Sequence, residues 1–336
     1  MNARHLLYLC LAGAAVLPAA TDYRLTGPFT QDQITVYLVH LDPTQTKPIA
    51  GKRYLPLGEA LAQRKVAVHE TGTVNELAIE NLSPDTDVFI QSGDIVKGGQ
   101  QDRVFSTDLI LPPKSGRTRI ESFCVEQGRW TKRGGEDVRL FSTSANAIVS
   151  RDAKLAIKGS KNQGDVWKSV AAMQSRLSGV VGGVIGAGVA SAASPTSLQL
   201  SLENKAVNQS AEKHAAALRN FVAGQPSALG YVFAIGGEIQ SADIYASPAL
   251  FRELWPKQAQ ALAIEAIGEK TKPGAAKLAP EAALAFLARA EQAAAPVMEA
   301  PNGRTRVVKR DSPKALYVES HDAAAKSWIH RSYTAK

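Results

Sequence analysis

The first half of the chain carries short runs of β-branched and aromatic residues, several of which alternate apolar with polar positions. This pattern is typical of β-strands, and turn sequences such as TGT, SPDTD, SGD, KGG and PPKSG separate the runs. Only residues 57–64, LGEALAQR, resemble a helix instead. The pattern predicts an antiparallel β-sandwich or barrel-like unit over residues 21–150, with strands at residues 34–41, 65–70, 74–82, 88–90, 104–111 and 118–125.

The second half changes to helical spacing of its apolar residues. A hairpin is expected at residues 231–245, turning at Gly236-Gly237, because a two-residue loop needs positive φ angles. Ser247 and Pro248 mark a helix start, and Pro256 is expected to end that helix before a new one begins. We therefore predict an α+β protein whose residues 151–336 form a helix-rich unit, with helices at residues 164–177, 202–222, 248–255, 257–267 and 281–295 and strands at residues 304–310, 315–320 and 327–333. The alternative, one integrated domain, stays open.

A glycine-rich stretch, residues 179–200, contains no charged residue. No strand precedes it and no Lys-Ser/Thr pair follows its glycines, so it does not match a phosphate-binding loop. Gly, Ser and Pro dilute its hydrophobicity, which disfavours a membrane span. We predict a mobile loop at residues 179–197.

The N-terminus has the pattern of a secretory signal peptide. A short basic region at Arg4 and His5 precedes an apolar run of about 11 residues, and small residues follow at positions 18–20. Such a run is too short to span a bilayer, which needs about 20 residues. A lipoprotein anchored at Cys10 is the less favoured alternative, since bulky Leu9 precedes it. Cleavage of residues 1–20 predicts a periplasmic or secreted protein.

Charge and cysteine content limit the partners and the covalent links that the protein can have. The formal net charge of the 336 residues is +8, but the basic residues are scattered, so a nucleic-acid partner is not expected. Without its leader the chain keeps a single cysteine, Cys124, and therefore has no intramolecular disulfide. We expect Cys124 to be a small buried residue rather than a nucleophile. No histidine pair has metal-ligand spacing on one element, and no cofactor motif is present.

The motif VEQGRW, at the end of the strand predicted at residues 118–125, contains several side chains that can bind a ligand. Arg129 can bind a carboxylate or phosphate in bidentate fashion, and Trp130 offers a stacking surface. Glu126 and Gln127 add hydrogen-bonding groups. The set suits a polar, planar or anionic ligand, but Glu126 and Arg129 could instead form a structural ion pair.

A second polar segment, SGDIVKGGQQDR, lies between two predicted strands, with its loop around Gly98-Gly99. We predict that its side chains Asp94, Gln101 and Arg103 face the VEQGRW motif across a pocket. His330, in the last predicted strand, is a candidate acid or base because histidine titrates near neutral pH. Glu126 and His330 are thus the candidate catalytic residues.

Several segments resemble the ARPP-1 family (ARG and rhodanese-phosphatase-superfamily-associated domain) over about residues 54–336. They are YLPLGEALAQRKVAVHETGTVNELAIENLS, SGDIVKGGQQDRVFSTDLILPPKS, SFCVEQGRW, GYVFAIGGEIQSADIYASPALFRELWPKQ and SWIHRSY. The family name implies gene association with ADP-ribosylglycohydrolases, which is not a mechanism. The glycine-rich stretch is the main departure from the family pattern, and Gln100 stands where the matching segment usually has a lysine.

Three functions are compatible with these residues. The favoured hypothesis is an exported, non-catalytic protein that binds a small polar or anionic ligand, or a protein partner, at VEQGRW. The first alternative is a hydrolase of a phosphorylated or ADP-ribose-like ligand, with Glu126 as base, His330 as acid and Arg103 and Arg129 as anion clamps. The second alternative is a membrane-apposed structural protein that uses residues 179–200. The hydrolase requires its residues to meet in one concave site.

Overall fold

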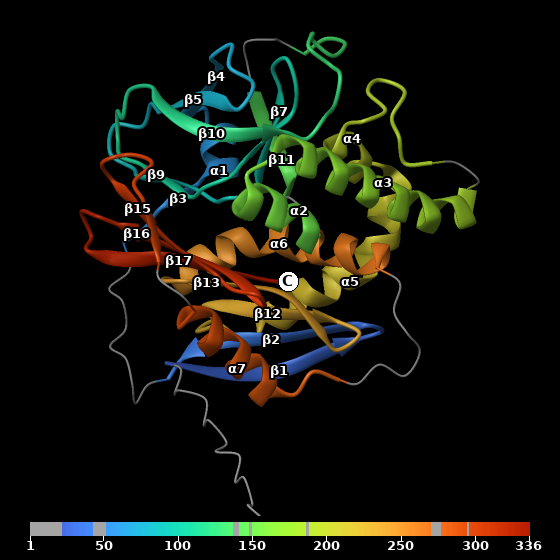
Figure 1. Ribbon diagram of the computed structural model, residues 1–336, viewed down its shortest axis with the longest axis vertical. Helices are drawn as coiled ribbons and strands as arrows, with labels where there is room; N and C mark the ends of the chain where they lie inside the picture. The colour runs from blue at the N-terminus through green and yellow to red at the C-terminus, as the bar shows by residue number, and fades with distance from the viewer. Residues whose placement is uncertain are drawn as a thin grey trace, which may run out of the picture.

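The computed structural model is an α+β protein built from antiparallel sheets and helices, as the sequence predicts (Figure 1). It describes residues 22–42, 52–136, 141–147, 150–185, 188–269, 277–293 and 296–336. The expected signal peptide, residues 1–20, lies outside the described residues.

The largest sheet joins the two ends of the chain. Its eight strands are, in spatial order, β1 (Tyr23–Gln31), β2 (Ile34–Leu41), β12 (Gly230–Ile235), β13 (Glu238–Tyr245), β17 (Ser327–Ala335), β16 (Ala315–Asp322), β15 (Thr305–Asp311) and β14 (Val297–Glu299). The β12–β13 turn has φ angles of 57° at Gly236 and 82° at Gly237, which confirms the predicted hairpin.

Strand β2 pairs with β1 on one side and with β12 on the other, so the boundary expected at residue 150 does not separate two sheets. The physical reason is that β2 is apolar on both faces. Ile34 and Val36 pack in one core cluster, and Tyr37 and Val39 pack in another on the opposite face. A strand of this kind needs cover on both sides, and the helices of the second half supply it.

Residues 55–147 supply the strands of two smaller sheets. The six-stranded sheet has the order β11 (Phe141–Ala147), β7 (Asp94–Gly98), β8 (Arg103–Phe105), β10 (Thr118–Cys124), β5 (Glu76–Asn81) and β4 (Val66–Glu70). The three-stranded sheet contains β3 (Leu55–Pro56), β6 (Val88–Ile90) and β9 (Leu109–Leu111), with β3 and β6 parallel. The sequence predicted a loop between the strands at residues 88–90 and 104–111. Residues 94–98 of that segment form strand β7 instead, because they pair with β8 and β11.

The helices fill the space between the sheets and cover the outer face of the large one (Figure 1). They are α1 (Leu57–Ala62), α2 (Arg151–Leu155), the π-helix η1 (Ala156–Ser160), α3 (Gln163–Ile185), α4 (Leu198–Leu202), α5 (Lys205–Ala223), α6 (Pro248–Gly268) and α7 (Pro280–Glu291). Helix α6 continues through Pro256, which corrects the predicted break. Buried residues on both sides of the proline, including Leu254 and Leu262, hold the helix between the large sheet and β11.

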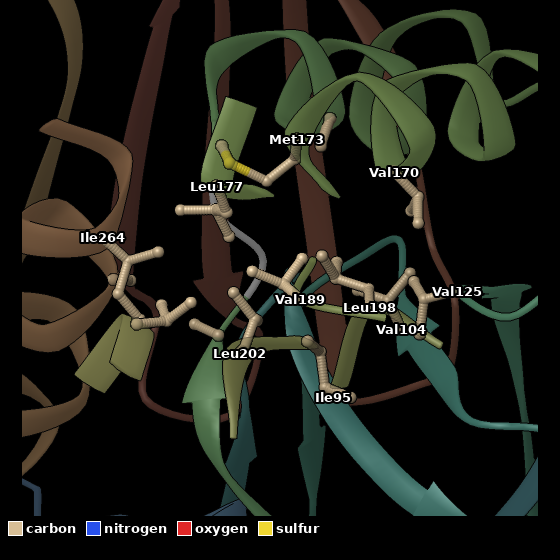
Figure 2. Close-up of a cluster of buried hydrophobic side chains, with 14 of the residues drawn as sticks. Ile95, Val104, Val125, Val170, Met173, Leu177, Val189, Leu198, Leu202 and Ile264 are labelled. Carbon is tan, nitrogen blue, oxygen red and sulfur yellow. The ribbon is translucent and has the colours of Figure 1, made fainter. Parts of the chain in front are cut away.

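Side chains of α3, α4 and α6 meet the β7–β8 pair in one apolar cluster (Figure 2). Helix α3 extends seven residues into the predicted glycine-rich loop, and Val181 is fully buried there. Beyond residues 186–187, which are not described, Val189 is also buried. None of the helices in the described ranges is both long and apolar enough to cross a membrane.

Candidate functional site

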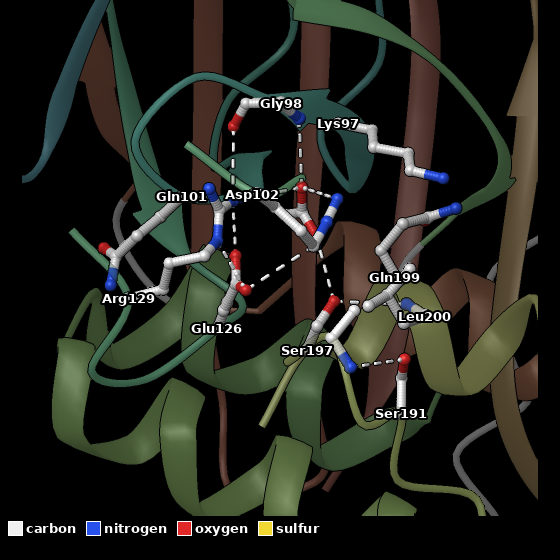
Figure 3. Close-up of polar contacts among 12 residues, drawn as sticks. Lys97, Gly98, Gln101, Asp102, Glu126, Arg129, Ser191, Ser197, Gln199 and Leu200 are labelled. Atoms are coloured by element: carbon white, nitrogen blue, oxygen red, sulfur yellow. Dashed lines mark hydrogen bonds and ion pairs between the residues drawn. The ribbon is translucent and has the colours of Figure 1, made fainter. Parts of the chain in front are cut away.

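Glu126 and Arg129 of the VEQGRW motif, which follows β10 in the sequence, form an ion pair (Figure 3). Glu126 is fully buried, its Oε1 accepts from Arg129 Nε at 2.7 Å, and its Oε2 accepts from the backbone N–H of Asp102 at 3.1 Å. Arg129 Nη1 also donates to the carbonyl of Gly99 at 3.2 Å. Burial alone would raise the pKa of Glu126, but the hydrogen bond from Arg129 helps to hold it below its usual value. Both side chains are therefore engaged within the protein.

Asp102 is the centre of the same network. Arg133 Nη1 and Nη2 donate to its two carboxylate oxygens at 2.8 and 3.0 Å, and Ser197 Oγ donates to Oδ2 at 2.9 Å. Burial opposes the charge of Arg133, yet the hydrogen bonds to Asp102 raise its pKa above the usual value. Sequence reasoning missed Arg133 and Ser197 because they lie 31 and 95 residues from Asp102. The network ties the β7–β8 hairpin to the segment that precedes α4.

The remaining residues at this end of the β-unit are arranged more loosely. Trp130 is 44% exposed, and Arg103 Cζ lies 5.5 Å from its ring centroid. Arg103 is fully buried and donates to Gln101 Oε1 at 3.2 Å, while its Nη2 lies 3.7 Å from a Glu70 oxygen. The side chain of Gln127 is exposed. The structure thus brings Gln101 and Arg103 together beside Trp130 of the motif.

Asp94, by contrast, belongs to another part of the molecule. Lys257 Nζ of α6 donates to its Oδ1 at 2.6 Å, and the backbone N–H of Gln91 donates to its Oδ2 at 2.9 Å. Strand β7 separates Asp94 from the Gly98 end of the hairpin, where the VEQGRW motif lies. The expectation that Asp94 faces this motif together with Gln101 and Arg103 is therefore wrong.

A groove of about 590 Å³ opens on the outer side of the Asp94–Lys257 pair, between α1, α5, α6 and β11. Pro56, Leu57 and Leu254 form apolar parts of its lining. Lys257 is its only lining residue with a basic side chain, whereas five carboxylates line it, from Glu59, Asp94, Glu203, Glu212 and Glu253. Three of them pair with basic residues that are not part of the lining, as in Glu253–Arg53. The volume is typical of a small-molecule site.

Asp94 also lines a second, much smaller cavity of about 10 Å³, which we call the inner chamber. That volume is enough for about one water molecule. The chamber is lined by Gln91, Ser92, Gly93, Asp94, Ala147, Lys154, Lys158, Asp243 and Gln258. Asp94 is the residue that the linings of the groove and the chamber share.

His330 lies next to the chamber residue Asp243 and is almost completely buried. Its Nδ1 lies 2.7 Å from Asp108 Oδ2, its Nε2 lies 3.1 Å from Asp243 Oδ1, and its ring stacks on Tyr245 with centroids 4.7 Å apart. Burial alone would lower the pKa of His330, but the two carboxylates raise it to about 9. The side chain is therefore an imidazolium at neutral pH.

The two candidate catalytic residues do not meet. Glu126 bonds to groups around Asp102, whereas His330 bonds to Asp108 and Asp243, and the described contacts of the two share no hydrogen-bond or ion-pair partner. Cys124 is buried, as predicted, and burial raises the pKa of its thiol to about 11. Across the described ranges, no group of three or more His, Cys, Asp or Glu side chains is placed to hold a metal ion.

Comparison with known proteins identifies the family. The model of the ARG and Rhodanese-Phosphatase-superfamily-associated Protein domain, ARPP-1, matches residues 22–334. The chain belongs to the ARPP-1 family. No curated protein and no solved structure matches it significantly. Segments through which the chain resembles ARPP-1 proteins supply Ser92, Asp108, Tyr231, Asp243 and His330 to the chamber and its surroundings.

Proposed function

We propose that this ARPP-1 protein binds a small organic cation in the groove beside Asp94 and Lys257. The observation that carries the proposal is the composition of the lining: five carboxylates and one lysine line a cavity of ligand size. Four of these carboxylates are in ion pairs, and Glu59 has no ion-pair partner among the described residues. Clefts lined by one sign of charge concentrate ligands of the opposite sign. The apolar parts of the lining, such as Leu57 and Leu254, suit the alkyl groups of such a ligand.

A binding function is better supported than the hydrolase considered from the sequence. That hydrolase needs Glu126, two arginines and His330 around one substrate. Glu126 is instead bonded to Arg129, and His330 is enclosed by two aspartates and the ring of Tyr245. Asp94 also supports binding, because a ligand in the groove would contact a carboxylate that lines the chamber as well.

Thermal denaturation with a panel of ligands tests this proposal. We expect choline, tetramethylammonium and putrescine to raise Tm in a concentration-dependent way, since a ligand that binds only the folded state stabilises it. Sodium salts of small carboxylates at equal ionic strength serve as the comparison. The double variant Glu212→Gln/Glu253→Gln removes two lining charges and should reduce the shift.

A matched control is Glu76→Gln, which removes a carboxylate from an ion pair with the exposed Arg119, away from the groove lining. It should leave the cation-induced shift unchanged. Equal stabilisation by cations and carboxylates, or an equal loss of the shift in the control, would contradict binding in the groove.

We also propose that the protein is exported and that its mature chain begins near Thr21. The basic start, the short apolar run and the small residues at positions 18–20 support cleavage there. N-terminal sequencing of the native protein provides the test. A soluble cytoplasmic protein that retains Met1 would contradict export.

A further inference from the structure

Two lysines project into the protein interior from adjacent turns. Lys154 lies on α2 and Lys158 on the π-helix η1, and their exposed fractions are 7% and 6%. Lys154 Nζ donates to Ser241 Oγ at 2.9 Å, and Lys158 Nζ donates to Ser332 Oγ at 2.8 Å. Buried lysines are uncommon, and π-helical turns occur frequently at functional sites.

Both lysines line the inner chamber together with Asp243, whose Oδ2 accepts from the hydroxyl of Tyr231 at 2.6 Å. An amine that is desolvated and lies near a second cation loses its proton readily. Burial lowers the pKa of Lys158 and Lys154 lowers it further, whereas Asp243 and Asp108 raise it. The chamber thus places a desolvated amine, that of Lys158, within hydrogen-bond distance of the Ser332 hydroxyl, which can relay a proton.

We infer that Lys158 is a nucleophile that forms an imine with a small aldehyde or ketone, which enters the chamber from the groove past Asp94. The inference rests on the proposed function, because the groove carboxylates would hold a positive charge at the other end of that ligand. The ligand class is therefore a carbonyl compound with a cationic group. The chamber has room for about one water molecule, so the side chain of Asp94, which lines both spaces, must move aside to make room for the carbonyl group.

The chemistry requires no oxidant or reductant. The lone pair of the neutral Lys158 Nζ attacks the carbonyl carbon, a C–N bond forms, and the π electrons of the C=O bond move to oxygen. One proton passes from the nitrogen to that oxygen through the hydroxyl of Ser332, which accepts from Lys158 Nζ at 2.8 Å. The resulting hydroxyl group leaves with the second proton of the nitrogen as water while the C=N bond forms.

The competing explanation is a neutral salt cluster. Three carboxylates, Asp108, Asp243 and Glu265, accompany three basic side chains, His330, Lys154 and Lys158, in this region. In that arrangement Lys158 keeps its proton and does not react. The two explanations differ in the reactivity of a single amine.

Borohydride trapping distinguishes them. The whole protein is incubated with trimethylammonioacetaldehyde, reduced with sodium borohydride and mapped by peptide mass spectrometry. Lys168, whose side chain is 83% exposed, is the internal reference. We expect Lys158 to be labelled about tenfold faster than Lys168, and Lys158→Met to lose that label while Lys168→Met keeps it.

The uncharged tert-butylacetaldehyde has the same shape as the cationic probe and should label Lys158 more slowly. Labelling confined to exposed lysines would overturn the inference, and because the wild-type protein gives this result, folding of the variant is not required. Cation-induced stabilisation without a label on Lys158 would reject the imine alone. Equal labelling of Lys158 by both aldehydes, without such stabilisation, would support the imine and reject the cationic groove.

Discussion

Four side chains at one end of the β-unit differ in how fully they are engaged within the protein. They are Glu126 and Arg129 on the one hand, and Arg103 and Trp130 on the other. The first two form a short ion pair with little exposed area, and the side chain of Arg129 is only 9% exposed. Arg103 is buried beneath the half-exposed ring of Trp130, and its Nε and Nη2 donate no hydrogen bond within the described structure. The VEQGRW motif thus combines an internal ion pair with a more open surface.

Removal of Arg129 tests the ion pair. Arg129→Ala removes the closer of two cations that pair with the buried carboxylate of Glu126, since Arg133 Nη1 lies 3.5 Å away. This should cost roughly 3–5 kcal/mol in the free energy of unfolding. The double variant Arg129→Ala/Glu126→Gln should recover much of that loss, because no unpaired charge remains. Urea denaturation measures both.

Arg119→Ala is the matched control for this change. Arg119 is 81% exposed and pairs with Glu76, so its loss should cost less than about 1 kcal/mol. A small effect of Arg129→Ala would mean that the guanidinium faces solvent and is free for a ligand. A large effect that the double variant recovers means that this pair is structural.

The imidazolium of His330 predicts a loss of stability in alkali. Its pKa is about 9 in the folded protein, above the usual 6.5 of the unfolded chain. The stabilisation is therefore complete below about pH 6.5 and is lost as the pH rises through about 9, with a magnitude on the order of 3 kcal/mol. Urea unfolding at pH 6 and pH 10 should show this loss in the wild type.

His330→Gln should lack the component of the pH dependence that comes from the imidazolium. His69→Gln removes a histidine that pairs with Glu80 on the smaller sheet, and it should keep the wild-type dependence. The same alkaline loss in His330→Gln and in the wild type would show that His330 is neutral in the folded protein.

At the scale of elements, the short helix α4 is stabilised by contacts with the rest of the protein. Helix α4 has only five residues, and isolated helices of that length are unstable in water. Its N-cap residue, Ser197, accepts from the backbone N–H of Leu200 at 3.1 Å and also donates to the buried carboxylate of Asp102. The position of α4 therefore depends on the Asp102 network.

Ser197→Ala should cost about 2 kcal/mol in the free energy of unfolding, because it removes the cap and leaves a buried carboxylate with one donor fewer. Ser247→Ala is the control, since Ser247 caps α6 through backbone N–H groups only. It should cost about 1 kcal/mol. Equal costs would indicate that the hydrogen bond from Ser197 to Asp102 contributes nothing.

At the scale of the whole molecule, the large sheet makes the two halves of the chain interdependent. Strand β2 lies between β1 and β12, and all but its last residue are buried. Without the N-terminal strands, β12 would become an edge strand with apolar residues on both of its faces.

We therefore expect a fragment of residues 151–336 to be unfolded or aggregated when it is produced alone. The full chain should unfold in one cooperative transition, with circular dichroism and tryptophan fluorescence changing together. A soluble fragment with dispersed amide signals in an NMR spectrum would show that the second half is an independent domain.

Local patterns determined much of this protein without reference to the tertiary structure. A run of β-branched and aromatic residues identified β2, and alternating apolar and polar residues identified strands such as β5 and β10. Glycines located the β12–β13 turn, and Ser247 located the start of α6. These features depend on backbone preferences and on residues close in sequence, so a single chain carries the whole signal. The segments quoted from the sequence also identified the family.

The partners of the buried charges were decided only by the tertiary structure. Asp94 lies 163 residues from Lys257, and Asp108 lies 222 residues from His330. Lys154 and Lys158 look like surface residues in the sequence, because lysine is usually exposed. They are buried because α2 and η1 lie against the inner face of the large sheet, where hydroxyl groups and carboxylates compensate for their lost hydration. Local periodicity carries no information on such pairs, since their stability arises only when distant elements pack together.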